Sequence, residues 1–179
     1  MQPWIGMEYL QLSRGRRVAD LASLDLGAQQ VVRERQHAAV QKLGTTPANL
    51  CTISYCTPDP GFRFSGRRSA GAADLFVMPE HTAFDLYVPA GAQTTYVSLD
   101  QAAFLRAARA LNQRSWETAP RQVVALRTLH QAAFGELVSG WFTAAGSAAA
   151  RGRRFLHLGR FAGDYKRLFG EAPSATLSR

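Results

Sequence analysis

The sequence predicts an α+β protein in which an antiparallel β-domain is followed by helices. Residues 50–98 contain short runs of alternating apolar and polar residues between turn residues, as in AFDLYVP and TTYVSL. From Ser98 onward the apolar residues change to helical spacing. The chain of 179 residues is long enough for one well-packed core with an appendage.

The first third of the chain consists of short apolar segments separated by turn residues. IGMEYLQL and ADLASLDLG come first, followed by the longer run QQVVRERQHAAVQKLG at residues 29–44. The longer run fits a helix or a long bent strand, because Val31, Val32 and Val40 suit both. Gly44-Thr45-Thr46-Pro47 ends it, whichever structure it adopts.

Residues 50–98 are the most strand-like part. LCTISY is rich in β-branched and aromatic residues, and LFVMP ends at Pro79. Period-two alternation places Phe62 and Phe64 on one face of a strand. Phe84, Leu86 and Val88 share a face in the same way. Short strands with turns between them predict an antiparallel barrel or sandwich.

The two cysteines, Cys51 and Cys56, are five residues apart within CTISYC. On a strand this odd spacing directs them to opposite faces, which disfavours a local metal clip. We expect small buried thiols in a reducing compartment.

Two helices are expected after the β-domain. Ser98-Leu99-Asp100-Gln101 has the spacing of a capping box, so the first helix would begin there. Thr118 would cap the second, with Pro120 in its first turn. These helices could pack on the β-domain or against a second subunit. The apolar stripes that define them contain Phe104, Leu105, Ala108, Leu111, Val123, Leu126, Ala133, Phe134, Leu137 and Trp141.

The last sixth of the chain is basic. The net charge is +8, and residues 151–179 hold seven Arg and Lys against two acidic residues, a net of +5. A concentrated basic segment favours a polyanionic partner such as nucleic acid, the alternative being a solvated tail. Just before it, TAAGSAAARGRR at residues 143–154 is typical of a linker or a marginal helix.

The closing stretch HLGRFAGDYKRLFGEAPSATL, residues 157–177, predicts an amphipathic helix followed by a second helix. Gly170 would end the first helix and Pro173 would begin the second. One face would be polar and basic, which suits a major-groove reader as well as an ordinary solvated helix face. The opposite, apolar face would contain Leu158, Phe161, Tyr165, Leu168 and Phe169.

This closing stretch resembles the end of the second helix-turn-helix of AraC/XylS-type transcription regulators. The matching positions are Phe155, Phe161, Tyr165, Lys166, Phe169, Gly170 and Pro173. The run His-Leu-Gly-Arg-Phe is similar to a subgroup that includes regulators of ethanolamine-utilisation operons. DLFVMPEHTAFDLYVPAG, residues 74–91, is similar to the sensor domain of that subgroup, which implies a cupin-like β-barrel.

The resemblance implies a sequence-specific DNA-binding transcription regulator. Its recognition helix, about residues 157–169, would lie in the major groove of duplex DNA. The barrel would hold an unidentified small-molecule effector, and the helices at 98–141 could form a homodimer. The residues implied at base edges are His157, Gly159, Arg160, Gly163 and Asp164, and those implied at phosphates or on the helix flank are Lys166 and Arg167.

The implied domains are a cupin-like barrel at 1–97, a helical segment at 98–142 and a DNA-binding segment at 143–179. The family has two helix-turn-helix units joined by a long helix, and this chain has a counterpart only for the end of the second unit, as after an internal deletion or a frame shift before Phe155. DNA binding by so short a segment would be weak and strongly salt-dependent. The alternative function is a β-barrel module without DNA binding, which binds a small effector or pairs with related regulators.

No catalytic, cofactor or metal site is expected. His37, His81, His130 and His157 lie in four separate segments, whereas a cupin-type metalloenzyme needs several histidines and a carboxylate together. Gly-rich phosphate loops, nucleophile elbows and HExxH motifs are missing from the sequence. The sequence also contains no apolar run of the roughly 20 residues needed to span a bilayer and no signal-peptide pattern, so we expect a cytoplasmic protein.

Overall fold

The computed structural model describes residues 8–14, 17–57, 59–68, 74–111 and 113–149. The described residues up to Gln101, together with 120–131, form one compact unit that contains the strands. Of the described residues, 102–111, 113–119 and 132–149 belong to a second unit. The α+β prediction is therefore confirmed for the part of the chain that the structure describes.

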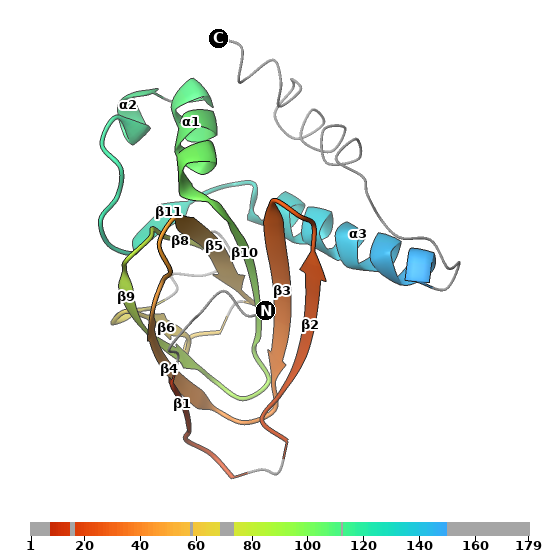
Figure 1. The fold of residues 1–179 in the computed structure, drawn as a ribbon. Helices are drawn as coiled ribbons and strands as arrows, with labels where there is room; N and C mark the ends of the chain where they lie inside the picture. The colour runs from red at the N-terminus through yellow and green to blue at the C-terminus, as the bar shows by residue number, and fades with distance from the viewer. Residues whose placement is uncertain (1–7, 15–16, 58, 69–73, 112, 150–179) are drawn as a thin grey trace. The chain divides into compact units, whose positions relative to one another are not determined.

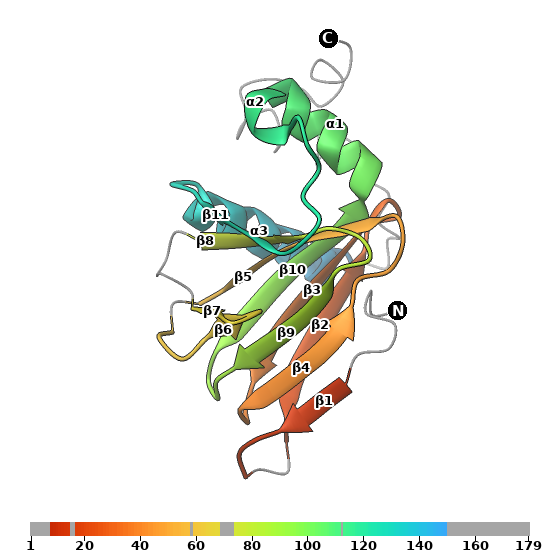
Figure 2. The ribbon, with the colours of Figure 1, turned by 90° about the vertical axis from the view of Figure 1, so that its left-hand side faces the viewer.

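The strand unit consists of two antiparallel sheets (Figure 1). Figure 2 shows the five-stranded sheet from its outer side, with β1 as its outermost strand. That sheet has the order β1 (Glu8–Gln11), β4 (Val40–Thr45), β9 (Ala83–Val88), β6 (Arg63–Phe64) and β7 (Arg67–Arg68). The six-stranded sheet has the order β11 (Val124–Arg127), β8 (Asp74–Met78), β5 (Leu50–Cys56), β10 (Gln93–Asp100), β3 (Gln29–Gln36) and β2 (Ala19–Asp25).

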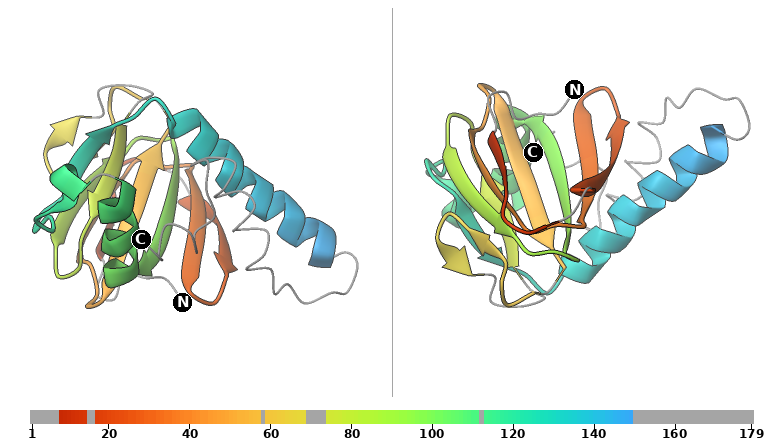
Figure 3. Two further views of the ribbon diagram at one scale, coloured as in Figure 1. Left: turned by 90° about the horizontal axis from the view of Figure 1, so that it is seen from above. Right: turned by 90° about the horizontal axis from the view of Figure 1, so that it is seen from below.

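The predicted closed barrel is wrong, since the described strands form two separate ladders that face one another (Figure 3). Residues 29–44 show how the chain divides between the two sheets. This run is neither a helix nor one long strand, because β3 pairs with β10 in one sheet and β4 pairs with β9 in the other. The chain crosses between the sheets at residues 37–39, where the His37 and Ala38 N–H groups donate to the Val18 carbonyl.

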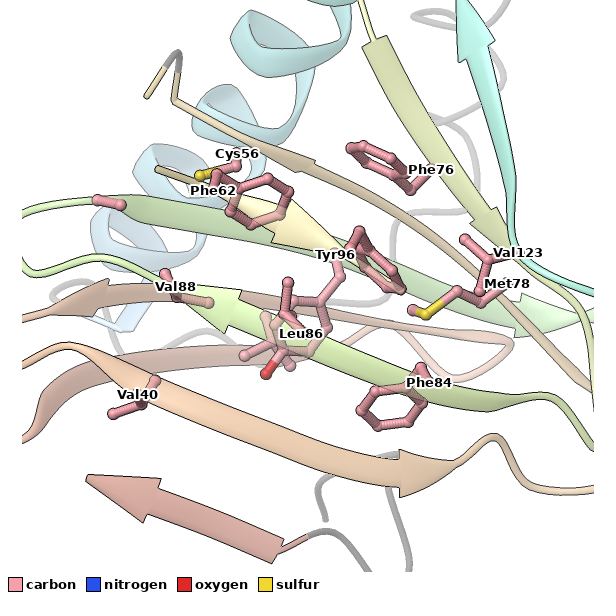
Figure 4. Packing of buried hydrophobic residues seen from close by; sticks show 13 residues of the cluster. Val40, Cys56, Phe62, Phe76, Met78, Phe84, Leu86, Val88, Tyr96 and Val123 are labelled. Atoms are coloured by element: carbon pink, nitrogen blue, oxygen red, sulfur yellow. The ribbon is translucent and has the colours of Figure 1, made fainter. Parts of the chain in front are cut away.

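The core lies between the two sheets and is built mainly from the inward positions of β3, β4, β5, β6, β8, β9 and β10 (Figure 4). Phe62, Phe64, Phe84, Leu86 and Val88 are buried, so the predicted core faces of these segments are confirmed. Aromatic packing is dense at the centre, where the rings of Phe64 and Phe76 stack with centroids 5.0 Å apart.

The predicted capping box at Ser98 is wrong. Ser98 is buried inside β10, and its hydroxyl lies 2.9 Å from the Thr52 hydroxyl on β5. Helix α1 (Gln101–Leu111) begins three residues later. The Gln101 side chain bonds to Glu80 instead of to Ser98. Tertiary pairing of β10 therefore overrides the local helix-start signal.

The predicted helix from Thr118 to Trp141 is also wrong at its beginning. Residues 124–127 form strand β11, which pairs with β8. Helix α3 (Gln131–Ala149) starts only after this strand and includes the Ala-rich residues 143–149, so the helical alternative holds for that part of 143–154. In the second unit, α1 packs on the short helix α2 (Gln113–Trp116) through an edge-to-face contact of Phe104 with Trp116.

Candidate functional site

The seven sequence-predicted DNA-binding residues lie outside the described residues. The structure therefore neither brings them together nor separates them. They are His157, Gly159, Arg160, Gly163, Asp164, Lys166 and Arg167. The notable chemistry of the described residues lies elsewhere, between the two sheets.

A group of polar side chains occupies the sheet interior close to the β1 and β2 edges. We call Tyr9, Glu34, Gln36, Lys42 and Thr94 the interior polar cluster. Its members come from four strands, β1, β3, β4 and β10. All but Tyr9 are 3% exposed or less, so this is a charged and hydrogen-bonding site inside an otherwise apolar core.

Strand register explains why these residues meet. Glu34 and Thr94 are directly opposite one another in the six-stranded sheet, and Tyr9 and Lys42 are opposite in the five-stranded sheet. Directly opposite residues share a face, so each pair projects from the same side of its sheet. The two pairs face each other across the core, and an ion pair joins them: Lys42 Nζ donates to Glu34 Oε2 at 2.5 Å.

Burial of the ion pair dominates its electrostatics. Desolvation lowers the pKa of Lys42, while the Glu34 carboxylate opposes that shift. The other carboxylate oxygen, Glu34 Oε1, accepts from the Gln36 amide at 2.6 Å. A buried pair of this kind survives desolvation only when further hydrogen bonds hold it, and Glu34 has them.

Tyr9 closes the cluster on the side of the β1 edge. Lys42 Nζ lies 5.1 Å from the centroid of its ring. Burial and the neighbouring Glu34 charge raise the pKa of Tyr9. The residue is 39% exposed, so Tyr9 is the member of the cluster that solvent reaches.

Two buried oxygen atoms in the cluster have no hydrogen-bond partner among the described residues. They are Gln36 Oε1 and Thr94 Oγ1. Leaving such atoms unsatisfied costs about 1–3 kcal/mol each, so they favour a bound water or a ligand that supplies hydrogen-bond donors. Gln36 Oε1 and Thr94 Oγ1 are thus the atoms of the cluster that could accept a further hydrogen bond.

The thiols do not form a reactive site. Cys51 and Cys56 are both buried, and burial raises the pKa of each to about 12. Such thiols are almost wholly protonated at neutral pH and react poorly as nucleophiles or metal ligands. The sequence-based expectation of buried thiols is confirmed.

The described histidines are separated from one another. His37 Nε2 lies 2.8 Å from the Asp20 carboxylate, and this hydrogen bond is the main cause of the lowered pKa of Asp20. Within the described ranges, no three His, Cys, Asp or Glu side chains are arranged to hold a metal ion. None of the helices in those ranges is long and apolar enough to cross a bilayer.

The sequence interpretation missed the interior polar cluster, although a signal for it was present. If residues 29–44 are read as strands, Glu34 falls on the same face as Val32, and Lys42 on the same face as Val40. Two opposite charges at inward positions of successive strands indicate a buried pair. The helical alternative for this run obscured that pattern.

Comparisons with known proteins identify no relative. No family model matches the chain, and neither the curated proteins nor the solved structures contain a match. The functional assignment therefore depends on the sequence patterns and on the geometry described above.

Proposed function

We propose that this chain is a DNA-binding transcription regulator of the AraC type with a shortened DNA-binding segment. The observation that carries the proposal is the closing stretch at 157–177, where a basic helix pattern coincides with the helix-turn-helix resemblance. Further support comes from the uneven charge, since residues 151–179 carry a net +5. The described residues contribute only the α+β class to this proposal, as two antiparallel sheets together with helices.

In this proposal the two parts of the chain have separate tasks. Residues 157–169 enter the major groove, where Arg160 contacts base edges together with His157 and Asp164. Lys166 and Arg167 neutralise phosphates. The sandwich acts as the sensor and binds a small polar effector at the interior polar cluster.

The test is binding of the full chain to duplex DNA across a salt series, with enrichment from a random-sequence duplex pool. We expect weak binding that falls steeply with salt, and Arg160→Ala should lose the sequence preference. Lys166→Ala should weaken binding to all sequences and reduce the salt slope by about one. Arg106→Ala is the matched control, because it removes the same charge from an exposed position on α1.

The outcomes are distinct. An absence of binding at low salt would overturn the proposal as a present activity. If Arg160→Ala and Arg106→Ala weaken binding equally, the contact is unspecific charge attraction and the recognition-helix assignment is wrong.

A second candidate function is a ligand-binding β-module that does not bind DNA. The interior polar cluster favours it, because Gln36 Oε1 and Thr94 Oγ1 are buried without a partner among the described residues. Thermal unfolding with a panel of small polyols and primary amines tests it. Ligand stabilisation that disappears in Thr94→Val and persists in the exposed control Thr143→Val on α3 would support the module, and no shift with any compound would argue against it.

A further inference from the structure

Strand β2 is the outermost strand of the six-stranded sheet (Figure 1) and carries an exposed apolar residue, Leu21, at its middle. In the described residues, most large exposed apolar side chains belong to this edge or to the neighbouring β1 edge. They are Tyr9, Leu10, Leu12, Leu21 and Leu26. An exposed, apolar edge strand is a template for pairing with another strand.

The backbone of β2 is oriented for such pairing. At one end of the β2–β3 hairpin the Leu26 N–H donates to the Gln29 carbonyl, and at the other end the Val18 carbonyl accepts from His37. The antiparallel alternation therefore directs the even-numbered residues of β2 toward β3. The N–H and C=O groups of Ala19, Leu21, Ser23 and Asp25 point away from β3, toward the edge.

Natural edge strands are commonly blunted by Pro, Lys or a bulge. The sequence of β2, ADLASLD, contains no Pro and no Lys. Its ladder to β3 is continuous over seven residues, from Ala19 to Asp25. The strand thus presents an uninterrupted edge.

We propose that β2 pairs antiparallel with β2 of a second copy of this chain, about a two-fold axis at Leu21. In this register Leu21 lies opposite the Leu21 of the second copy, and Ala19 lies opposite its Ser23. All of these are odd-numbered positions, so the outward backbone groups of both strands meet. The two six-stranded sheets become one continuous sheet.

Charge complementarity selects this register. It places Arg17 opposite the second copy's Asp25, and symmetry makes two such pairs. The other two-folds that bring outward backbone groups together are less favourable, since a two-fold at Ala19 would place Arg17 opposite Leu21 and a two-fold at Ser23 would place Leu21 opposite Asp25. In the single chain Arg17 pairs with Asp20, and one Asp25 oxygen accepts from the Gly27 N–H at 2.9 Å. Both side chains are thus already placed at the edge.

The test is sedimentation equilibrium of the full chain without DNA, using charge exchange. We expect a dimer whose dissociation constant rises about tenfold in Arg17→Glu and in Asp25→Arg, because each places like charges opposite one another. The double variant Arg17→Glu/Asp25→Arg restores opposite charges and should recover the wild-type constant. Circular dichroism and urea midpoints verify that each variant folds.

Apolar positions provide a matched comparison. Leu21 and Leu111 are both 46% exposed, the first on β2 and the second on α1. We expect Leu21→Lys to abolish the dimer and Leu111→Lys to leave it intact. The proposal would be overturned if the wild-type chain is a monomer at all concentrations, or if the double variant dimerises no more tightly than the single variants. Loss of the dimer only in Leu111→Lys would also overturn it and would place the dimer contact on the helices at 98–141.

Discussion

At the scale of single residues, the Glu34–Lys42 pair is the most consequential feature of the described structure. Both side chains are almost fully buried, and each compensates the charge of the other. The net stabilisation from such a pair is small, whereas breaking it leaves an isolated charge in an apolar surrounding. The pair therefore acts mainly as a constraint on how the two sheets face each other.

Removing one partner should be costly. We expect Lys42→Met to lower the free energy of unfolding by about 3–5 kcal/mol, because the Glu34 carboxylate remains buried and uncompensated. The double variant Glu34→Leu/Lys42→Met should recover most of that loss. Urea unfolding measures both, with the exposed Arg121→Met as a control expected within about 0.5 kcal/mol of wild type. A double variant that is as unstable as Lys42→Met would contradict this account.

Tyr9 should make stability fall in alkali. Its pKa is raised in the folded chain, so above the ordinary tyrosine value of about 10 the unfolded chain releases this proton first. The contribution of Tyr9 is therefore complete below about pH 10 and declines as pH rises further. Lys42 has a lowered pKa, so its contribution to stability changes with pH in the opposite direction. Because Lys42 is present in both wild type and Tyr9→Phe, its contribution cancels when the two are compared. The stability difference between the two, measured in urea from pH 8 to 11, should shrink above about pH 10, and a constant difference would argue against a raised pKa of Tyr9 in the folded chain.

At the scale of secondary-structure elements, the start of α1 is fixed by bonds that are distant in sequence. Glu80 Oε1 accepts from the Gln101 amide at 2.8 Å, and Glu80 Oε2 accepts from the Asn49 N–H at 2.6 Å. In return the Glu80 N–H donates to Gln101 Oε1 at 2.7 Å. Two turns between strands and the first residue of the helix are thus joined by one carboxylate.

Glu80 should therefore affect stability more than its partial exposure suggests. We expect Glu80→Ala to reduce the free energy of unfolding by about 1–3 kcal/mol, since the Asn49 N–H and the Gln101 amide both lose an acceptor. Glu80→Gln keeps one acceptor oxygen and should cost clearly less. Thermal unfolding of the two variants beside Glu117→Ala, an exposed carboxylate, provides the comparison. Equal losses in Glu80→Ala and Glu117→Ala would refute the joining role.

At the scale of the whole molecule, the strand unit is held by one core between two sheets. Phe76 lies at its aromatic centre, with ring centroids 5.0 Å from Phe64 and 5.8 Å from Phe62. These rings come from strand β8 of one sheet, from β6 of the other and from the turn before β6. A core that joins distant segments in this way should unfold cooperatively.

Truncating this centre should destabilise the entire strand unit. We expect Phe76→Ala to cost about 3–5 kcal/mol, through lost transfer energy and the cavity that remains. Leu129, which is 96% exposed, is the matched control, and Leu129→Ala should change stability by less than about 0.5 kcal/mol. Urea unfolding followed by both tryptophan fluorescence and circular dichroism would reveal a loss of cooperativity as non-coincident curves.

Much of the strand pattern could be predicted because alternation is a local property. The inward faces of Phe62 with Phe64, and of Phe84 with Leu86, follow from period-two spacing alone. The errors arose where local signals competed with distant partners. Ser98 has the spacing of a helix cap but is held in β10 by Thr52, and residues 124–127 have helical spacing but pair with β8.

By itself, the sequence determined the α+β class, the apolar faces of most strands, the buried state of the two thiols and the basic character of the closing segment. These depend on residue type and on spacing within a few positions. Only the tertiary structure decided that the strands form two ladders and that Glu34 meets Lys42. It also decided that β2 is left at an edge with Leu21 exposed. Those outcomes depend on which strands pair across long stretches of chain, and the free energy of such pairing is shared among residues far apart in sequence.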